Sequence, residues 1–151
     1  MRMRGFTLME VLIAIGIVIV LTTLVGFSFS AYRKSSDVTA VTDSLLSYLK
    51  EARADTLSSK SDSSWGVHIE TSRIVIFKGA SFTNGAPGNR QTTLPNTTQI
   101  SSISLTGGGS DVLFKRLTGE TDQNGTIVIQ SVADSSVTSI VTIQPTGTAS
   151  S

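Results

Sequence analysis

The sequence contains no cysteine, and charged residues make up only 15% of its 151 positions. The lack of cysteine excludes a disulfide framework and thiolate-bound zinc or iron–sulfur centres. The net charge is +1, so no global field draws the chain toward nucleic acid or anionic lipid. Small hydroxyl side chains are abundant instead, with 23 Ser and 20 Thr. This composition favours a solvated, β-rich surface over a helical cytosolic enzyme.

Groups that carry out catalysis or bind cofactors are also scarce. His68 is the only histidine, and although it shares an expected strand face with Glu70, no third metal ligand accompanies it. Gly107-Gly108-Gly109 lacks the lysine and the following helix of a phosphate-binding loop. No serine comes with a recognisable base and orienting group. We therefore expect no enzymatic activity, no cofactor and no metal.

One long apolar segment lies near the N-terminus. The 22 residues from Val11 to Tyr32 carry no charge, which is enough for a helix to cross the ~30 Å hydrocarbon core of a bilayer. A secretory signal peptide has a shorter apolar core, of about 7–15 residues, and a small-residue cleavage site that is not evident here. The segment therefore predicts a membrane-spanning helix. Its flanking positive charges are nearly balanced and indicate its orientation only weakly.

The residues that begin this segment form a specific motif. Arg4-Gly5-Phe6-Thr7-Leu8-Met9-Glu10-Val11-Leu12-Ile13-Ala14 resembles the class III signal of type IV pilins and of type II secretion pseudopilins. The resemblance implies cleavage by prepilin peptidase between Gly5 and Phe6, and N-methylation of the new terminus at Phe6. It also implies an assembly role for Glu10, the fifth residue of the processed chain. The basic leader, the glycine, the phenylalanine and the glutamate offset all match together.

The chemistry of the motif suits helix-on-helix assembly. Cleavage creates an α-amine at Phe6, and methylation leaves that amine a base. In an apolar bundle it can pair with the Glu10 carboxylate of a neighbouring subunit, since a buried unpaired charge is very costly. The resemblance implies a single-pass inner-membrane protein with a cytoplasmic N-terminus and a periplasmic or extracellular head. Its implied partners are prepilin peptidase, other pilin or pseudopilin subunits and the inner-membrane assembly platform.

The helical pattern continues beyond the apolar segment. Apolar residues follow an i, i+3/i+4 spacing that predicts an amphipathic helix over residues 33–57, and the Ser-rich stretch 58–64 should end it. The expected stripe consists of Val38, Val41, Leu45, Leu49 and Ala52. With the assembly segment at 6–32, this gives one helix from about Phe6 to Leu57.

The remainder, residues 65–151, predicts a β-rich head. Strands are expected over 65–70, 73–77, 100–105, 112–117, 126–132 and 137–143, with Thr71-Ser72 as a hairpin turn. Asn124-Gly125 should supply a further turn. Residues 82–99 form the longest irregular segment, either a functional or a flexible loop, and 145–151 should be frayed.

This order of elements looks like the α+β pilin fold, a long N-terminal helix packed on an antiparallel sheet. Leu49-Lys50-Glu51-Ala52-Arg53-Ala54, Trp65-Gly66-Val67-His68-Ile69 and the closing strands through Gly147 are most similar to the GspH/FimT family of minor pseudopilins. The chain lacks the C-terminal cysteine pair of many major pilins. It also lacks a calcium loop like that of major pseudopilins. Calcium needs about six to eight oxygen ligands, and residues 133–136 offer one carboxylate. These departures favour a minor subunit, in either a type IV pilus or a secretion pseudopilus, with residues 1–5 as the leader.

Two alternatives remain open at this point. One is a binding module displayed on a pilus, an adhesin or a DNA-uptake receptor, which the loop at 82–99 would serve. DNA binding needs clustered cations, yet from Leu117 to the end there is no Lys or Arg, so nucleic acid is not expected as a partner. The other alternative is a signal-anchored envelope protein that never polymerises.

Overall fold

The computed structural model describes residues 6–151, apart from the side chains of residues 24–31. The chain forms two compact units, Met1–Arg33 and Lys34–Ser151, and each is described here by itself. The helical elements are α1 (Leu8–Leu57) and a short 3₁₀ helix, η1 (Lys60–Asp62). The strands are β1 (Trp65–Ile69), β2 (Arg73–Lys78), β3 (Arg90–Thr93), β4 (Thr98–Leu105), β5 (Asp111–Leu113), β6 (Gly125–Ser131), β7 (Thr138–Ile143) and β8 (Ala149–Ser150). The protein is thus an α+β protein with antiparallel sheets.

Helix α1 is 50 residues long and ends where the Ser-rich stretch begins. Beyond it, Ser59, Ser61 and Asp62 have φ values of 50°, 57° and 52°, in the left-handed region that a right-handed helix cannot continue through. Within the described residues, no helix combines the length and the hydropathy of a membrane span. The span expected over 6–32 therefore stays a prediction. The leader 1–5 lies outside the described residues.

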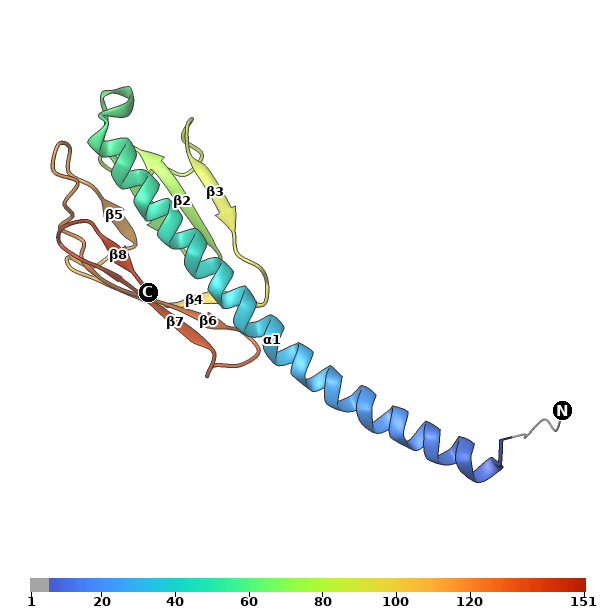
Figure 1. Ribbon diagram of the computed structural model, residues 1–151. Helices are drawn as coiled ribbons and strands as arrows, with labels where there is room; N and C mark the ends of the chain where they lie inside the picture. The colour runs from blue at the N-terminus through green and yellow to red at the C-terminus, as the bar shows by residue number, and fades with distance from the viewer. Residues whose placement is uncertain (1–5) are drawn as a thin grey trace. The chain divides into compact units, whose positions relative to one another are not determined.

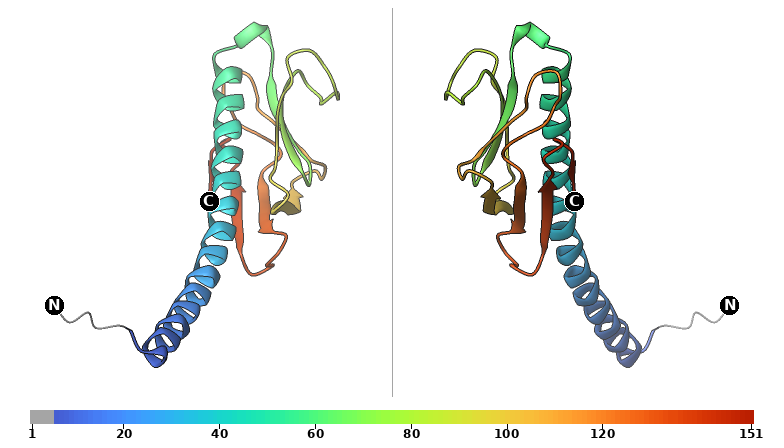
Figure 2. Two further views of the ribbon diagram at one scale, coloured as in Figure 1. Left: turned by 90° about the vertical axis from the view of Figure 1, so that its right-hand side faces the viewer. Right: turned by 90° about the vertical axis from the view of Figure 1, so that its left-hand side faces the viewer.

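The strands form two four-stranded antiparallel sheets. In the first the order is β3-β2-β1-β5, and in the second it is β4-β6-β7-β8. The hairpin expected at Thr71-Ser72 is confirmed, with Ile69 opposite Ile74 and Trp65 opposite Lys78. Within the unit Lys34–Ser151, both sheets lie against the same side of α1 (Figures 1 and 2).

The core of this unit lies between α1 and the two sheets. The expected helix stripe is confirmed, because its five apolar side chains are all at most 5% exposed and belong to one apolar cluster. Val67, Ile74 and Ile76 enter that cluster from the first sheet, and Ile127 and Val141 enter it from the second. The unit is therefore a helix packed on two sheets around one core.

Three expectations about the strands were wrong. The strand expected over 112–117 covers only Asp111–Leu113, since residues 115–120 close a turn in which the Gly119 amide donates to the Lys115 carbonyl at 2.8 Å. The irregular segment 82–99 contains β3, which pairs with β2, and the start of β4. The C-terminus is not frayed, because β8 pairs with β7.

A tight contact holds the C-terminal turn in place. Gly147 has φ +76°, and a Cβ there would lie 1.9 Å from the carbonyl oxygen of Gly119. The same carbonyl accepts a hydrogen bond from Nε of Arg53 at 3.1 Å. Only a glycine fits at 147, since it provides both the left-handed conformation and the room for this approach.

Candidate functional site

The first candidate site is the beginning of α1. Gly5 lies outside the described residues, while the Phe6 side chain is 83% exposed just before the helix. Thr7 caps the helix, because its Oγ1 accepts a hydrogen bond from the Glu10 backbone N–H at 3.2 Å. Thr7 and Glu10 have the spacing of a capping box, in which Ser or Thr is followed three residues later by Glu. Glu10 therefore lies in the first turn, where the helix dipole favours a negative charge.

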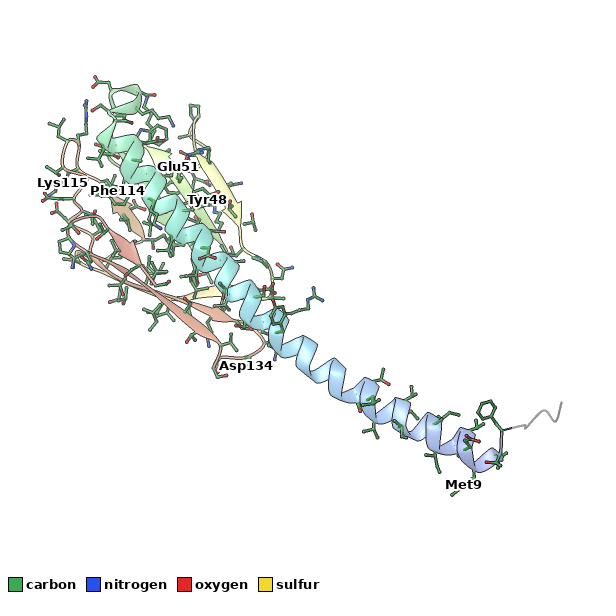
Figure 3. The ribbon with its side chains drawn as sticks, viewed as in Figure 1. Met9, Tyr48, Glu51, Phe114, Lys115 and Asp134 are labelled. Atoms are coloured by element: carbon green, nitrogen blue, oxygen red, sulfur yellow. The ribbon has the colours of Figure 1, made fainter. Side chains whose placement is uncertain are left out.

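The residues around Glu10 form an exposed apolar surface. Every described side chain from Phe6 to Thr23 is exposed. Met9 is labelled on the first turn in Figure 3, and it is 67% exposed. Within residues 6–151, the Glu10 carboxylate has no ion-pair or side-chain hydrogen-bond partner. The large apolar members of this surface are Phe6, Leu8, Met9, Val11, Leu12, Ile13, Ile15, Ile17, Val18, Ile19, Val20 and Leu21.

The second candidate site is a polar network on the first sheet. The ring of His68 on β1 lies between two carboxylates, with Nδ1 2.5 Å from Oδ1 of Asp111 and Nε2 3.2 Å from Oε1 of Glu70. Arg73 then holds Glu70 through two parallel hydrogen bonds, each 2.7 Å long. Phe82 stacks on the imidazole, with the ring centroids 3.8 Å apart and the planes 5° from parallel. The network thus joins β5, β1, β2 and the loop after β2.

The electrostatics of this network follow from the Arg73–Glu70 pair. The hydrogen bonds from Arg73 hold the pKa of the Glu70 carboxyl below its ordinary value, and His68 adds to the effect. The same pair raises the pKa of Arg73. A bidentate guanidinium–carboxylate pair fixes orientation as well as charge, so both side chains are held in one geometry.

The network offers limited chemistry. Among the residues that the structure describes, no group of three or more His, Asp or Glu side chains is arranged to hold a metal ion. The sequence places His68 and Glu70 on one strand face, and the structure does bring these two side chains together. Asp111 could not be found from the sequence, because it is 43 residues from His68 and arrives through the pairing of β5 with β1. The network therefore orients the guanidinium of Arg73.

The cations of the unit Lys34–Ser151 are largely used in ion pairs. Six basic side chains in the described part of the chain contact a carboxylate, which leaves little positive charge for a phosphate backbone. The pairs are Lys34–Asp134, Lys60–Asp55, Arg73–Glu70, Arg90–Glu51, Lys115–Asp122 and Arg116–Asp62.

Comparisons with known proteins add nothing to this geometry. The chain matches no family model, and neither a curated protein nor a solved structure was found that is similar to it.

Proposed function

We propose that this chain is a minor subunit of a type IV pilus or of a type II secretion pseudopilus. In this proposal it is cleaved between Gly5 and Phe6, N-methylated at Phe6, and assembled through the first half of α1. The observation that carries the proposal is the contrast along one helix. The stripe from Val38 to Ala52 is covered by the chain's own core, whereas the apolar side chains from Phe6 to Leu21 are all exposed. Apolar surface of that extent needs lipid or other helices to cover it.

Glu10 has a specific role in the proposed assembly. Its carboxylate lies in the first helical turn with no side-chain partner within residues 6–151. In a bundle of such helices, the methylated amine of Phe6 on a neighbouring subunit supplies the missing positive charge. Because an unpaired ion in an apolar environment is so unfavourable, the pair also fixes the register between helices.

The remaining partners follow from the same proposal. Prepilin peptidase removes residues 1–5 at the cytoplasmic face, and the assembly platform of the inner membrane adds the subunit to a filament. The unit Lys34–Ser151, which contains the head at 65–151, then lies outside the cytoplasm. No chemistry is assigned to this head, and its antiparallel sheets and single core suit a filament surface.

Replacing Glu10 tests the proposal. Glu10→Ala should be inserted and cleaved normally, since peptidase recognition depends on the leader and Gly5. It should then accumulate in the membrane and be lost from sheared filaments. Breaking a buried ion pair costs about 3–5 kcal/mol, which corresponds to a loss of two orders of magnitude or more in incorporation. Immunoblots of the membrane and filament fractions give the measurement.

Two variants make this test specific. Asp43→Ala removes an exposed carboxylate from the second half of the same helix and should assemble like the unchanged chain. Gly5→Leu should be inserted but stay uncleaved, which separates a pilin-like subunit from an anchor that is never processed. Normal recovery of Glu10→Ala in filaments would overturn the assembly role. Normal cleavage of Gly5→Leu would overturn the proposed processing.

A further inference from the structure

A polar pocket lies beside the His68 network on the first sheet. It has a volume of about 400 Å³, within the ~300–1,000 Å³ range of small-ligand sites. Its polar lining consists of Arg73 and Gln91 from the paired strands β2 and β3, and of Asn84 and Asn89 from the loop between them. Gly85 also lines the pocket and adds no side chain to it. The pocket therefore joins two strands and the segment 79–89.

The loop that forms the pocket is held in place from several sides. The Ala86 amide donates to the Thr83 carbonyl at 3.3 Å, and Nδ2 of Asn89 donates to the same carbonyl at 2.9 Å. Phe82 anchors the loop, because it stacks on His68 and packs edge-on against Phe77 with the ring centroids 5.7 Å apart. A pocket whose walls are fixed before binding loses less entropy when a ligand enters.

The charge of the pocket is balanced. The guanidinium of Arg73 gives two hydrogen bonds to the Glu70 carboxylate, a third to Oε1 of Gln91 at 3.2 Å and a longer one to Oδ1 of Asn84 at 3.5 Å. Arg73 is therefore an oriented donor whose charge Glu70 already neutralises. An anion gains little from such a group, since it would have to compete with a carboxylate that is held at two points.

The hydrogen-bonding groups that remain are of both kinds. Within the described residues, one N–H of Arg73 Nη1, the amide nitrogen of Asn84 and that of Gln91 are donors without a protein acceptor. Oδ1 of Asn89 is an acceptor without a protein donor. A hydroxyl group both donates and accepts, so several neighbouring hydroxyls match this set better than a carboxylate, a phosphate or an apolar group.

We infer that this pocket binds a neutral, hydroxyl-rich ligand, that is, a saccharide. Arg73, Asn84 and Gln91 donate hydrogen bonds to it, and Asn89 accepts one. Val75 and Ala86, the small apolar members of the lining, face the carbon atoms of the sugar ring. The hydrogen-bonded series Asp111–His68–Glu70 orients the Arg73 guanidinium. This binding is independent of filament assembly, so either one can fail without the other.

Side-chain amide signals give a direct test. The full chain, ¹⁵N-labelled and held in a phosphocholine detergent so that no sugar headgroup competes, is titrated with maltotriose, with triacetylchitotriose and with inorganic phosphate. The side-chain NH₂ signals of Asn84, Asn89 and Gln91 should shift at millimolar saccharide and not with phosphate. A response to maltotriose indicates a ligand read by hydroxyls alone, and a response limited to triacetylchitotriose indicates an N-acetylated sugar. Both support the inference.

Variants connect the response to the pocket. Asn84→Ala removes the Nδ2 donor, together with an Oδ1 that only accepts a long hydrogen bond from Arg73. It should weaken saccharide binding by about five- to tenfold, the loss expected for one hydrogen bond. Gln144→Ala, at an exposed glutamine beyond β7, serves as the matched control and should leave binding unchanged. The inference is overturned if neither saccharide shifts the three signals, if phosphate alone does, or if Asn84→Ala binds as tightly as the unchanged chain.

Discussion

The two parts of helix α1 have similar backbones and opposite surroundings. From Leu8 to Thr23, the described side chains are exposed whether they are apolar or polar. From Val38 to Ala52, the helix buries one stripe against two sheets and exposes the opposite face. The first part is almost wholly apolar, whereas the second part carries its buried apolar residues in one stripe. Among the residues that the structure describes, the second part is covered by the sheets of its own unit, whereas the side chains of the first part are exposed.

The comparison shows which part of the sequence the fold itself explains. A leucine at 45 or 49 is required because it fills the core of the unit Lys34–Ser151. A leucine at 12 or 21 contributes nothing to that core, so the reason for its apolarity lies outside the described chain. Shortening one leucine in each part should therefore have very different effects on stability.

The largest effect is expected in the core. Leu45 is fully buried, and Leu45→Ala should destabilise the unit Lys34–Ser151 by about 2–5 kcal/mol through lost burial and the cavity left behind. Leu12, which is 59% exposed, is the matched control, and Leu12→Ala should change stability by less than about 0.5 kcal/mol. Chemical unfolding of the full chain in detergent, followed by Trp65 fluorescence, compares the two. Equal losses would mean that the first part of α1 also belongs to the folded core.

Two glycines differ in how closely the surrounding backbone approaches them. Gly147 and Gly108 both have positive φ values, +76° and +73°, but only Gly147 has backbone within reach of an added Cβ. Gly108→Ala should cost about 1–2 kcal/mol from conformation alone. Gly147→Ala should cost more, about 2–3 kcal/mol in total, because the Gly119 carbonyl must also move. The same unfolding measurement applies, and equal costs would contradict the close approach of the two turns.

The smallest effect concerns pH. Mainly through its hydrogen bonds from Arg73, Glu70 has a lower pKa in the folded protein than its ordinary 4.5. Its contribution to stability is therefore complete above about pH 4.5 and is lost as the pH falls through the folded value. Because the carboxylate is about one-third exposed, the loss should be small.

Melting curves between pH 3 and pH 7 provide the measurement. Glu70→Gln should flatten the acid limb of the stability profile, since an amide cannot titrate. Glu10→Gln, which lies in the other unit, should leave the profile of the head as it is. An unchanged acid limb in Glu70→Gln would mean that the Arg73 pair contributes no pH-dependent stability.

Much of the fold could be predicted because its signals are local. The helix stripe has a 3.6-residue period, and β1 and β2 are apolar runs joined by a two-residue turn. Strand β3 has no such signal, since Arg90-Gln91-Thr92-Thr93 contains no apolar residue. It forms because it pairs with the edge of β2 and because two contacts join it to α1. These are a hydrogen bond between the hydroxyl groups of Tyr48 and Thr92 and an ion pair of Arg90 with Glu51. Figure 3 labels Tyr48 and Glu51 on the helix beside β2 and β3.

The two candidate sites differ in how far the sequence could identify them. Gly5, Phe6 and Glu10 lie within one short sequence motif, so they can be identified without a structure. Their roles stay predictions. The network around His68 is assembled from residues that are distant along the chain, Asp111 and Phe82 among them. The contact between His68 and Asp111 depends on the pairing of β5 with β1, and no local sequence pattern predicts this pairing.

The place of the C-terminus in the head has a consequence for synthesis. Ile143 is part of the core, β8 pairs with β7, and Gly147 lies against the turn that carries Gly119. The ribosome adds these residues long after the helix residues that they cover, because β7 and β8 follow α1 far along the chain. The apolar stripe of α1 therefore stays without its full cover until these strands have been made. We expect nascent chains of this protein to depend on chaperones during that interval.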